Sequence, residues 1–233
     1  MKRLLFVLLT IPMILQGQII GSWKMNGSSS DGSGNGYNGT DYYITYSQGI
    51  SGQCALFNGT TSGIVFSITN SFPINASART INLWCNSLTP TTNNAVLFIY
   101  GSSASTGRRF NLNIDTVNSR INIGFGTAQE YSSAFTYKNK WNMITAVVPV
   151  GADSTNDVLI YINGVLSATT FASSRMMNTI QDLRYPSIGT ATATNTPSGT
   201  YFKGYIDDVQ IWNTAWSAAY IKNNYSFYKG FFQ

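Results

Sequence analysis

The stretch FNLNIDTVNSRINIGF (110–125) alternates apolar and polar side chains on both sides of a short polar turn. In its first half, Phe110, Leu112 and Ile114 are separated by asparagines, and the second half repeats the pattern. Neighbouring side chains of an extended strand point to opposite faces, so a two-residue period separates an apolar face from a polar one. The stretch therefore predicts a β-hairpin with one face toward a core and the other toward water.

Strand patterns dominate the rest of the chain as well. In LIYINGV (159–165), Asn163-Gly164 joins two apolar runs and predicts a tight hairpin, because both turn residues need positive φ. Only the segment from Ser217 to Tyr225 has helical spacing, with Ser217 as its N-cap. Many short strands and one short C-terminal helix predict an all-β antiparallel sandwich or barrel. Strands are expected at 64–68, 80–85, 95–100, 110–115, 121–125, 141–150, 158–162, 165–168 and 202–212.

The first residues have the pattern of an export signal. Lys2 and Arg3 precede an apolar run from Leu4 to Leu15, and no other long apolar run follows. This pattern predicts a secretory signal peptide at residues 1–17, because the run is too short to span a membrane comfortably. We therefore expect residues 18–233 to form one secreted, extracellular domain without a membrane span.

The charge content agrees with an exported β protein. Charged side chains make up only 10% of the 233 residues, where a typical domain has about a quarter. The basic residues are scattered, and only Arg108 and Arg109 are adjacent among those of the expected mature domain. Because nucleic-acid binding needs a basic stripe or patch, we expect no nucleic-acid partner.

Cys54 and Cys85 are the only two cysteines. An even number of cysteines in an exported chain predicts a disulfide between them. The alternative is two buried thiols, because free cysteine behaves as a small apolar residue.

The composition also excludes much catalytic chemistry. The chain has no histidine, which excludes histidine-based triads and histidine-ligated metals. Glu130 is the only glutamate, and Asp207 and Asp208 are the only acids close in sequence. Glycosidases usually need two facing carboxyls, whereas neighbouring strand residues point to opposite faces. We therefore expect that the protein is not an enzyme.

A glycine-rich segment, DGSGNGYNGT (31–40), contains the pattern GxGxxG at Gly34, Gly36 and Gly39. A dinucleotide site needs this pattern after a strand and at the start of a helix, where amide groups hold the pyrophosphate. Here the pattern leads into TDYYITYSQGI (40–50), which favours extended chain. The segment is therefore interpreted as a turn-rich loop rather than a nucleotide site.

Six motifs occur together and in order along the chain. They are Trp23 with the glycine-rich segment, GQCALFNG (52–59), TINLW (80–84), WNMITAVV (141–148), LIYINGV (159–165) and FKGYIDDVQIWNTAWSAAYI (202–221). This series resembles the laminin G-like, concanavalin A-like jelly-roll domains, and it is similar in outline to pentraxins. The resemblance covers nearly all of residues 18–233 and implies two antiparallel sheets packed face to face, with the first and last strands side by side.

The resemblance also implies that the glycine-rich segment lies beside the strand that carries Asp207. By alternation with Val209 and Ile211, the Asp207 carboxylate is expected to point toward the core, which is costly unless it is paired. Asp31, Asp207 and loop carbonyls would then suit one structural Ca²⁺, since calcium prefers oxygen ligands. The alternative is that Asp207 accepts backbone hydrogen bonds and holds the loop in place.

The binding residues are left open by the sequence. Exposed tyrosines are natural platforms for sugar rings, Arg108-Arg109 could hold an anionic ligand, and Trp84, Trp141 and Trp212 are expected in the core. We expect a secreted, non-catalytic binding module that recognises carbohydrate or an extracellular cell-surface or matrix protein, with a role in adhesion. The alternative is a structural subunit of an extracellular or virion-like assembly, and the sequence leaves the oligomeric state open. The candidate tyrosines are Tyr42, Tyr43, Tyr46, Tyr131 and Tyr185.

Overall fold

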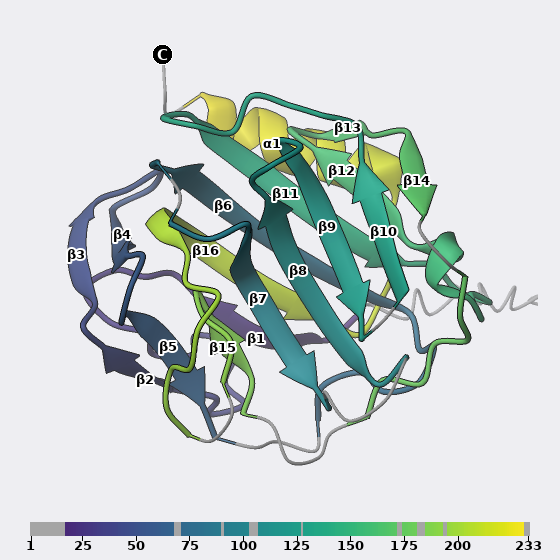
Figure 1. Ribbon diagram of the computed structural model, residues 1–233, viewed down its shortest axis with the longest axis horizontal. Coiled ribbons are helices and arrows are strands. Elements are labelled where there is room, and N and C mark those ends of the chain that lie inside the picture. The colour runs from purple at the N-terminus through teal and green to yellow at the C-terminus, as the bar shows by residue number, and fades with distance from the viewer. Residues whose placement is uncertain are drawn as a thin grey trace, which may run out of the picture.

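The computed structural model describes residues 17–67, 71–89, 91–102, 107–126, 128–171, 174–180, 185–192 and 195–230. These residues form two antiparallel sheets packed face to face, with one helix near the C-terminus (Figure 1). The predicted jelly-roll β-sandwich is thereby confirmed. Nearly all of the expected signal peptide, residues 1–16, lies outside the described residues. Within the described ranges, no helix is both long enough and apolar enough to cross a membrane.

The first sheet, called sheet A, contains the strands nearest both ends of the described chain. The amino-terminal strand β1 (Ile19–Trp23) pairs with the last strand, β16 (Lys203–Trp212), as the resemblance implied. The remaining order across the sheet is β13 (Val165–Leu166), β12 (Leu159–Ile162), β11 (Trp141–Val148), β6 (Arg79–Ser87), β16, β4 (Gln53–Asn58) and β3 (Thr45–Gln48).

The second sheet, called sheet B, contains the hairpin that the alternating stretch predicts. Strands β8 (Arg109–Asp115) and β9 (Arg120–Phe125) pair antiparallel, with Leu112 opposite Ile123. The full order is β14 (Thr169–Phe171), β10 (Ala128–Ser132), β9, β8, β7 (Asn94–Gly101), β15 (Ser187–Ile188), β5 (Gly63–Phe66) and β2 (Gly39–Tyr42).

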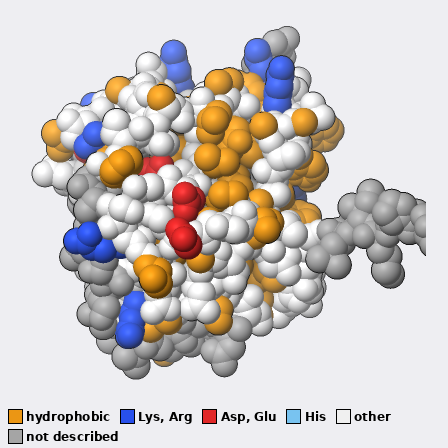
Figure 2. Space-filling model, turned by 90° about the vertical axis from the view of Figure 1, so that its right-hand side faces the viewer, with side chains coloured by type: hydrophobic (Ala, Val, Ile, Leu, Met, Phe, Trp, Pro, Cys, Tyr) orange, Lys and Arg blue, Asp and Glu red, His pale blue; other side chains and the backbone are white. Residues whose placement is uncertain are grey.

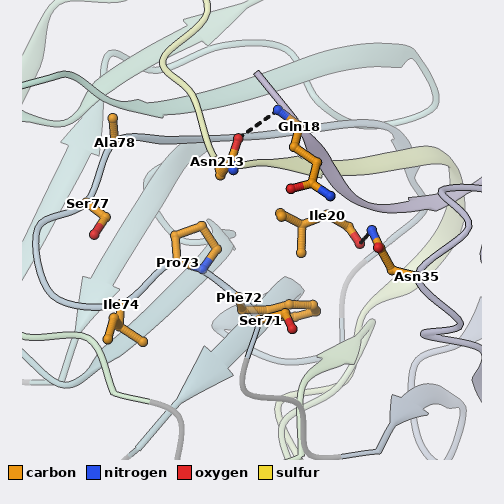
Figure 3. A pocket seen from close by; sticks show the side chains of 10 residues that line it. All are labelled: Gln18, Ile20, Asn35, Ser71, Phe72, Pro73, Ile74, Ser77, Ala78 and Asn213. Atoms are coloured by element: carbon orange, nitrogen blue, oxygen red, sulfur yellow. Dashed lines mark hydrogen bonds between the residues drawn. The ribbon is translucent and has the colours of Figure 1, made fainter. Parts of the chain in front are cut away.

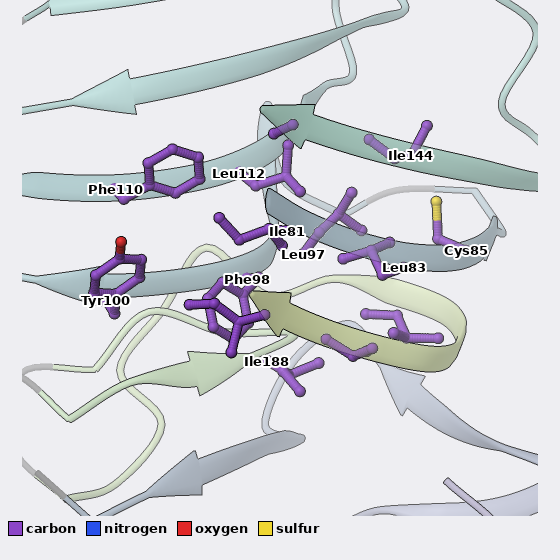
Figure 4. Packing of buried hydrophobic residues seen from close by; sticks show 14 of the residues in the cluster. Ile81, Leu83, Cys85, Leu97, Phe98, Tyr100, Phe110, Leu112, Ile144 and Ile188 are labelled. Atoms are coloured by element: carbon purple, nitrogen blue, oxygen red, sulfur yellow. The ribbon is translucent and has the colours of Figure 1, made fainter. Parts of the chain in front are cut away.

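The main core lies between the two sheets. Phe110, Leu112 and Ile114 of β8 are fully buried there, and Ile81 and Leu83 of β6 meet them from sheet A (Figure 4). Removing each such side chain from water contributes about 1.5–3 kcal/mol. The two-residue period of the sequence therefore accounts directly for which face of each sheet is apolar.

A second, smaller core lies on the outer face of sheet A, beneath helix α1 (Ala218–Lys229). The side chains of Ile221 and Tyr228 from the helix pack there with Trp84 of β6, whose ring stacks on Tyr225 at 5.7 Å between centroids. Trp141 and Trp212, which were expected in the core, are partly buried against the same cluster. The remaining members of this second core are Ile50, Met143, Val147, Tyr161 and Trp216.

The predicted helix start and hairpin turn are both confirmed. The Ser217 side chain accepts a hydrogen bond from the Tyr220 amide and so caps α1, which runs one turn further than the sequence predicts. Asn163 and Gly164 have φ values of 53° and 79° between β12 and β13, as a tight hairpin turn requires. The short connector η1 (Thr155–Asp157) precedes this hairpin and is a 3₁₀ turn capped by Ser154.

The direction expected for Asp207 is wrong, because a bulge interrupts the alternation in β16. The register of β16 against β6 shifts between Asp207 and Gln210, and Asp208 has a φ of 46°. Ile206 and Val209 both face the main core, while Asp207 pairs with Trp84 on the outer face of sheet A. One extra residue therefore turns the Asp207 carboxylate away from the space between the sheets.

The disulfide prediction is also wrong, and the alternative of two buried thiols is confirmed. Ile206 pairs with Ala55 on one side and Cys85 on the other, so all three side chains face the main core. Cys54 precedes Ala55 and points to the opposite face of the sheet, where its thiol lies 3.4 Å from the Gln48 carbonyl oxygen. Burial raises the pKa of Cys85 to about 12, which keeps this thiol protonated.

Candidate functional site

A polar hollow lies on the outer face of sheet B. The asparagines that alternate with core residues in β8 and β9 point into it, and Asn111, Asn113 and Asn122 are only 9%, 4% and 3% exposed. An outward-facing amide is normally solvated, so this degree of burial is unusual. We call the site the asparagine hollow; its volume is about 240 Å³.

The hollow is deep because a loop covers one side of it. The chain between β15 and β16 runs beside β7, where the Val96 amide donates a 3.1 Å hydrogen bond to the Thr200 carbonyl oxygen (Figure 1). Ala191 and Thr200 from this loop line the hollow opposite the asparagines. Val96 and Ile99 are buried, lie outside the main core and line the same hollow. The loop thereby forms a wall beside a face that alternation alone predicts to be open.

Two amide oxygens in the hollow, those of Asn111 and Asn113, have no hydrogen-bond donor among the described residues. Both Oδ1 atoms are buried. A buried acceptor without a partner costs about 1–3 kcal/mol, so these oxygens favour donors that enter from outside. Hydroxyl groups or ordered water molecules fit this requirement, whereas an apolar ligand does not.

Charged and aromatic groups flank the asparagines. The Asp115 Oδ2 atom accepts a 2.9 Å hydrogen bond from Arg120 Nε, and the Arg120 guanidinium lies 3.6 Å from the centroid of the Tyr131 ring. Burial alone would raise the pKa of Asp115, but hydrogen bonds from Asn118 and Arg120 outweigh it and lower the pKa below its ordinary value. This carboxylate therefore stays ionised and paired with Arg120.

Only some of the tyrosines and arginines that the sequence suggested as ligand-binding residues lie on this face. Tyr131 pairs with Asn122, and Arg109 lines the hollow. Tyr42 and Tyr46 instead carry hydroxyls that donate to the Asn195 carbonyl and to Asp41. The remaining predicted residues, Tyr43, Arg108 and Tyr185, do not line the hollow.

The proposed calcium ligands hold two separate loops. Asp31 accepts hydrogen bonds from the amides of Ser22, Ser33 and Tyr37, at 2.8–3.0 Å, and from the Ser33 hydroxyl. Burial alone would raise the pKa of Asp31, but the amides of Ser33 and Ser22 outweigh it and lower the pKa. This carboxylate therefore organises the start of the glycine-rich segment.

Asp207 serves a different loop. Its carboxylate accepts hydrogen bonds of 2.8 Å from the amides of Ile50 and Asp208, and burial raises its pKa to about 6. Within the described residues, no three cysteine, aspartate or glutamate side chains gather as a metal site would require. Because the oxygens of Asp31 and Asp207 already accept amide donors in separate loops, this arrangement does not favour a shared calcium ion, and the calcium hypothesis stays a prediction.

The asparagines were visible in the sequence but were interpreted only as a solvated face. Their spacing, at positions 111, 113 and 122, placed them on one face of the hairpin. Nothing in the spacing indicated the covering loop, whose nearest residue, Thr200, is far away in sequence. The signal that could have singled them out is chemical, because this face of the hairpin carries three asparagine amides and no lysine.

The fold is a jelly-roll β-sandwich with a polar hollow on the outer face of sheet B. The family model described as the concanavalin A-like lectin/glucanases superfamily, Laminin_G_3, matches residues 57–222, and the chain belongs to this family. A search of curated proteins finds no match.

Solved structures with the same fold share little sequence with the chain. Domain 4 of AbnA, an extracellular arabinanase from Geobacillus stearothermophilus, in complex with arabinotriose, has a TM-score of 0.65 at 19% identity; the match covers 89% of this chain and 98% of that one. The binding domain of Paraclostridial Mosquitocidal Protein 1 has a TM-score of 0.66 at 16% identity, covering 91% and 52%. A Trypanosoma rangeli sialidase has a TM-score of 0.64 at 14% identity, covering 89% and 32%. This chain therefore spans about half of the binding domain of the mosquitocidal protein and about a third of the sialidase.

Proposed function

We propose that the chain is a secreted, non-catalytic binding module that takes a hydroxyl-rich glycan in the asparagine hollow. The observation that carries the proposal is the pair of buried Oδ1 atoms of Asn111 and Asn113, which accept no hydrogen bond within the described residues. Sugar hydroxyls donate to such oxygens, and asparagine amide groups donate back to ring and hydroxyl oxygens. At about 240 Å³ the hollow is smaller than the roughly 300–1,000 Å³ of typical small-molecule sites, so we expect it to hold only a small part of a glycan.

A binding role agrees with the chemistry of the hollow. Asp115, beside the hollow, is held by Arg120, and none of the described residues that line the hollow carries a carboxylate. A glycosidase needs two carboxyls facing each other across the bond it cleaves. The family includes both lectins and glucanases, and the AbnA domain was solved with arabinotriose, so glycan binding without hydrolysis is the role best supported here.

Secretion and adhesion extend this proposal. The basic start and apolar run of residues 1–17 support export, and the polar, weakly charged composition supports an extracellular location. A module that binds surface glycans would attach its carrier to cells or matrix.

The test is a glycan array probed with the chain and two variants. We expect binding to at least one glycan, and a loss of about a hundredfold in affinity for Asn111→Ala combined with Asn113→Ala, since two hydrogen-bonding amides are removed. Asn223→Ala is the matched control, because Asn223 is exposed on α1 beside the other sheet. Absence of binding on the array, or equal binding by the double variant, would contradict the proposal.

A second candidate function, a subunit of an extracellular or virion-like assembly, is favoured by one apolar edge. The stretch from Val158 to Ser174 has no charged residue in its sequence, and it contains β13 and β14, each at one edge of its sheet. On this side Val165, Leu166 and Phe171 are more than half exposed, and Figure 2 shows apolar side chains gathered there. Natural edge strands are usually protected by charge or proline.

Light scattering during size-exclusion chromatography separates the two candidates. If the edge mediates self-assembly, the chain elutes as an oligomer and Val165→Lys with Phe171→Lys returns it to a monomer. A monomer at high concentration would leave the glycan-binding role as the single candidate.

A further inference from the structure

Gln18 is held at the amino-terminal end of β1. Its amide nitrogen donates a 2.8 Å hydrogen bond to Asn213 Oδ1, and the Asn213 amide donates back to the Gln18 carbonyl oxygen at 3.2 Å. The next residue, Ile19, begins β1 opposite Trp212. Gln18 directly follows the expected signal peptide, residues 1–17, so it becomes the first residue of the exported chain when that segment is removed.

Gln18 lines a cleft of about 410 Å³, which we call the amide cleft. Figure 3 shows three amide side chains, those of Gln18, Asn35 and Asn213, facing the segment 71–78. Among the described residues that line the cleft, none is charged, and Phe72 presents buried apolar surface. An ammonium group on Gln18 would therefore gain no counter-charge from the lining of the cleft.

The glycine-rich segment engages one of these amides. Gly34 and Gly36 have φ values of 89° and 78°, which turn Asn35 back onto β1. There Asn35 Nδ2 donates hydrogen bonds to the carbonyl oxygens of Ile19 and Ile20, at 3.1 and 3.0 Å. The glycine pattern thus serves to hold the start of β1, and the Asn35 amide is fixed in place.

The Gln18 side-chain amide differs from the other two. Among the described residues no hydrogen bond reaches it, and Gln18 is exposed, so this side chain is free to fold back on its own backbone. In a chain that begins at Gln18, the α-nitrogen and the side-chain carbon Cδ lie at the two ends of a short flexible arm. A bond between them closes a ring of the size found in proline.

We infer that the exported chain begins with pyroglutamate, formed from Gln18 after residues 1–17 are removed. The inference rests on the proposed export and is independent of glycan binding. The α-nitrogen of Gln18 attacks Cδ of its own side chain, so that an N–Cδ bond forms and the Cδ–Nε2 bond breaks. Ammonia leaves and carries away one hydrogen of the α-amine. Nothing is oxidised or reduced, and no co-reactant is consumed.

The product suits its surroundings. The lactam is uncharged, as is the lining of the amide cleft. Its nitrogen keeps one hydrogen, and the exposed Asn213 side chain is free to turn its Oδ1 acceptor toward it. A ring of this kind is tolerated at the start of a strand, as proline is, and the pairing of β1 begins only at Ile19. A blocked terminus also lacks the free amine that aminopeptidases need, at a place where proteolysis concentrates.

The experiment measures the mass of the chain that a bacterial host exports when it expresses residues 1–233. The purified chain is incubated at neutral pH until its mass is constant, and its first peptide is identified by tandem mass spectrometry. We expect a chain that starts at residue 18 and is lighter, by one molecule of ammonia, than the sequence 18–233 predicts. Amino-terminal sequencing should fail until pyroglutamate aminopeptidase is added.

Gln18→Asn is the matched control, because it keeps the side-chain amide but lacks the methylene group that this ring needs. It should keep its full mass and an amine open to sequencing. A natural chain that starts at Gln18 and keeps its amine after incubation overturns the inference, while the proposed export survives. A chain that keeps residues 1–17, or is cut at another bond, overturns the proposed boundary and the inference together. The glycan array measures the proposed binding role separately.

Discussion

The outer faces of the two sheets differ in what covers them. On sheet A, Trp84, Met143 and Tyr161 point outward, and helix α1 buries them in a second core. On sheet B, Asn111 and Asn113 point outward, and a loop rather than a helix walls them in. The same two-residue alternation thus leads to packing on one face and to a polar hollow on the other. A face that buries amides without giving their oxygens donors is better suited to a ligand than to stability.

The largest effect is expected where the helix covers sheet A. Trp84→Ala should lower the free energy of unfolding by about 3–5 kcal/mol, because it leaves a cavity beneath α1. Urea unfolding followed by circular dichroism measures the change. A loss below about 1 kcal/mol would mean that packing beneath the helix adds little to stability. The outer faces of the two sheets would then not differ in this respect.

A smaller, pH-dependent effect on stability is expected from Glu130, a carboxyl group among the apolar side chains on the inner face of sheet B. Glu130 pairs with Ile123, which faces the core, and is 1% exposed. Burial raises its pKa to about 7, with Asp157 adding to the rise and the Thr169 hydroxyl offsetting part of it. Because the folded-state pKa lies above the unfolded value of about 4.3, the folded state binds more protons between these values.

Stability should therefore fall as pH rises from about 4.5 to about 7 and change little from this group above that. Glu130→Gln should remove this slope and raise the free energy of unfolding at pH 8 by about 2 kcal/mol, with the shift discounted for residual solvation. Urea titrations at pH 5 and pH 8 measure both values. Equal pH dependence of the variant and the natural chain would show that this carboxyl is solvated.

Substitution inside the asparagine hollow should separate stability from binding. Asn113→Leu should leave the free energy of unfolding unchanged or raise it by about 1 kcal/mol, because an unpaired buried amide oxygen is replaced by an apolar group. The same variant should lose glycan affinity. Paired measurements by urea unfolding and by the glycan array decide the matter, and a strongly destabilised variant would indicate a packing role instead.

The smallest effect is expected from a chelator. Since Asp31 and Asp207 already accept backbone amides in separate loops, EDTA should shift the melting midpoint by less than about 2 °C. A larger fall, reversed by added calcium, would restore the predicted structural ion.

The sequence was a good guide wherever a local pattern decided the outcome. The alternation in 110–125, the Asn163-Gly164 turn and the Ser217 cap each act over a few residues, and each appears as predicted. The errors arose where a difference of one position decides which face a side chain takes. The bulge at Asp208 reversed the expected direction of Asp207, and the neighbouring positions of Cys54 and Ala55 placed the two thiols on opposite faces.

The sequence by itself determined the class of fold and the apolar face of each sheet, because side-chain period is a property of the extended chain. It also determined that histidine-based chemistry is excluded. Only the tertiary structure decided which faces became sites. The loop over the asparagines, and the meeting of Gln18, Asn35 and Asn213 at one cleft, join residues that are far apart in the chain. Such contacts follow from the packing of whole sheets, which no local pattern encodes.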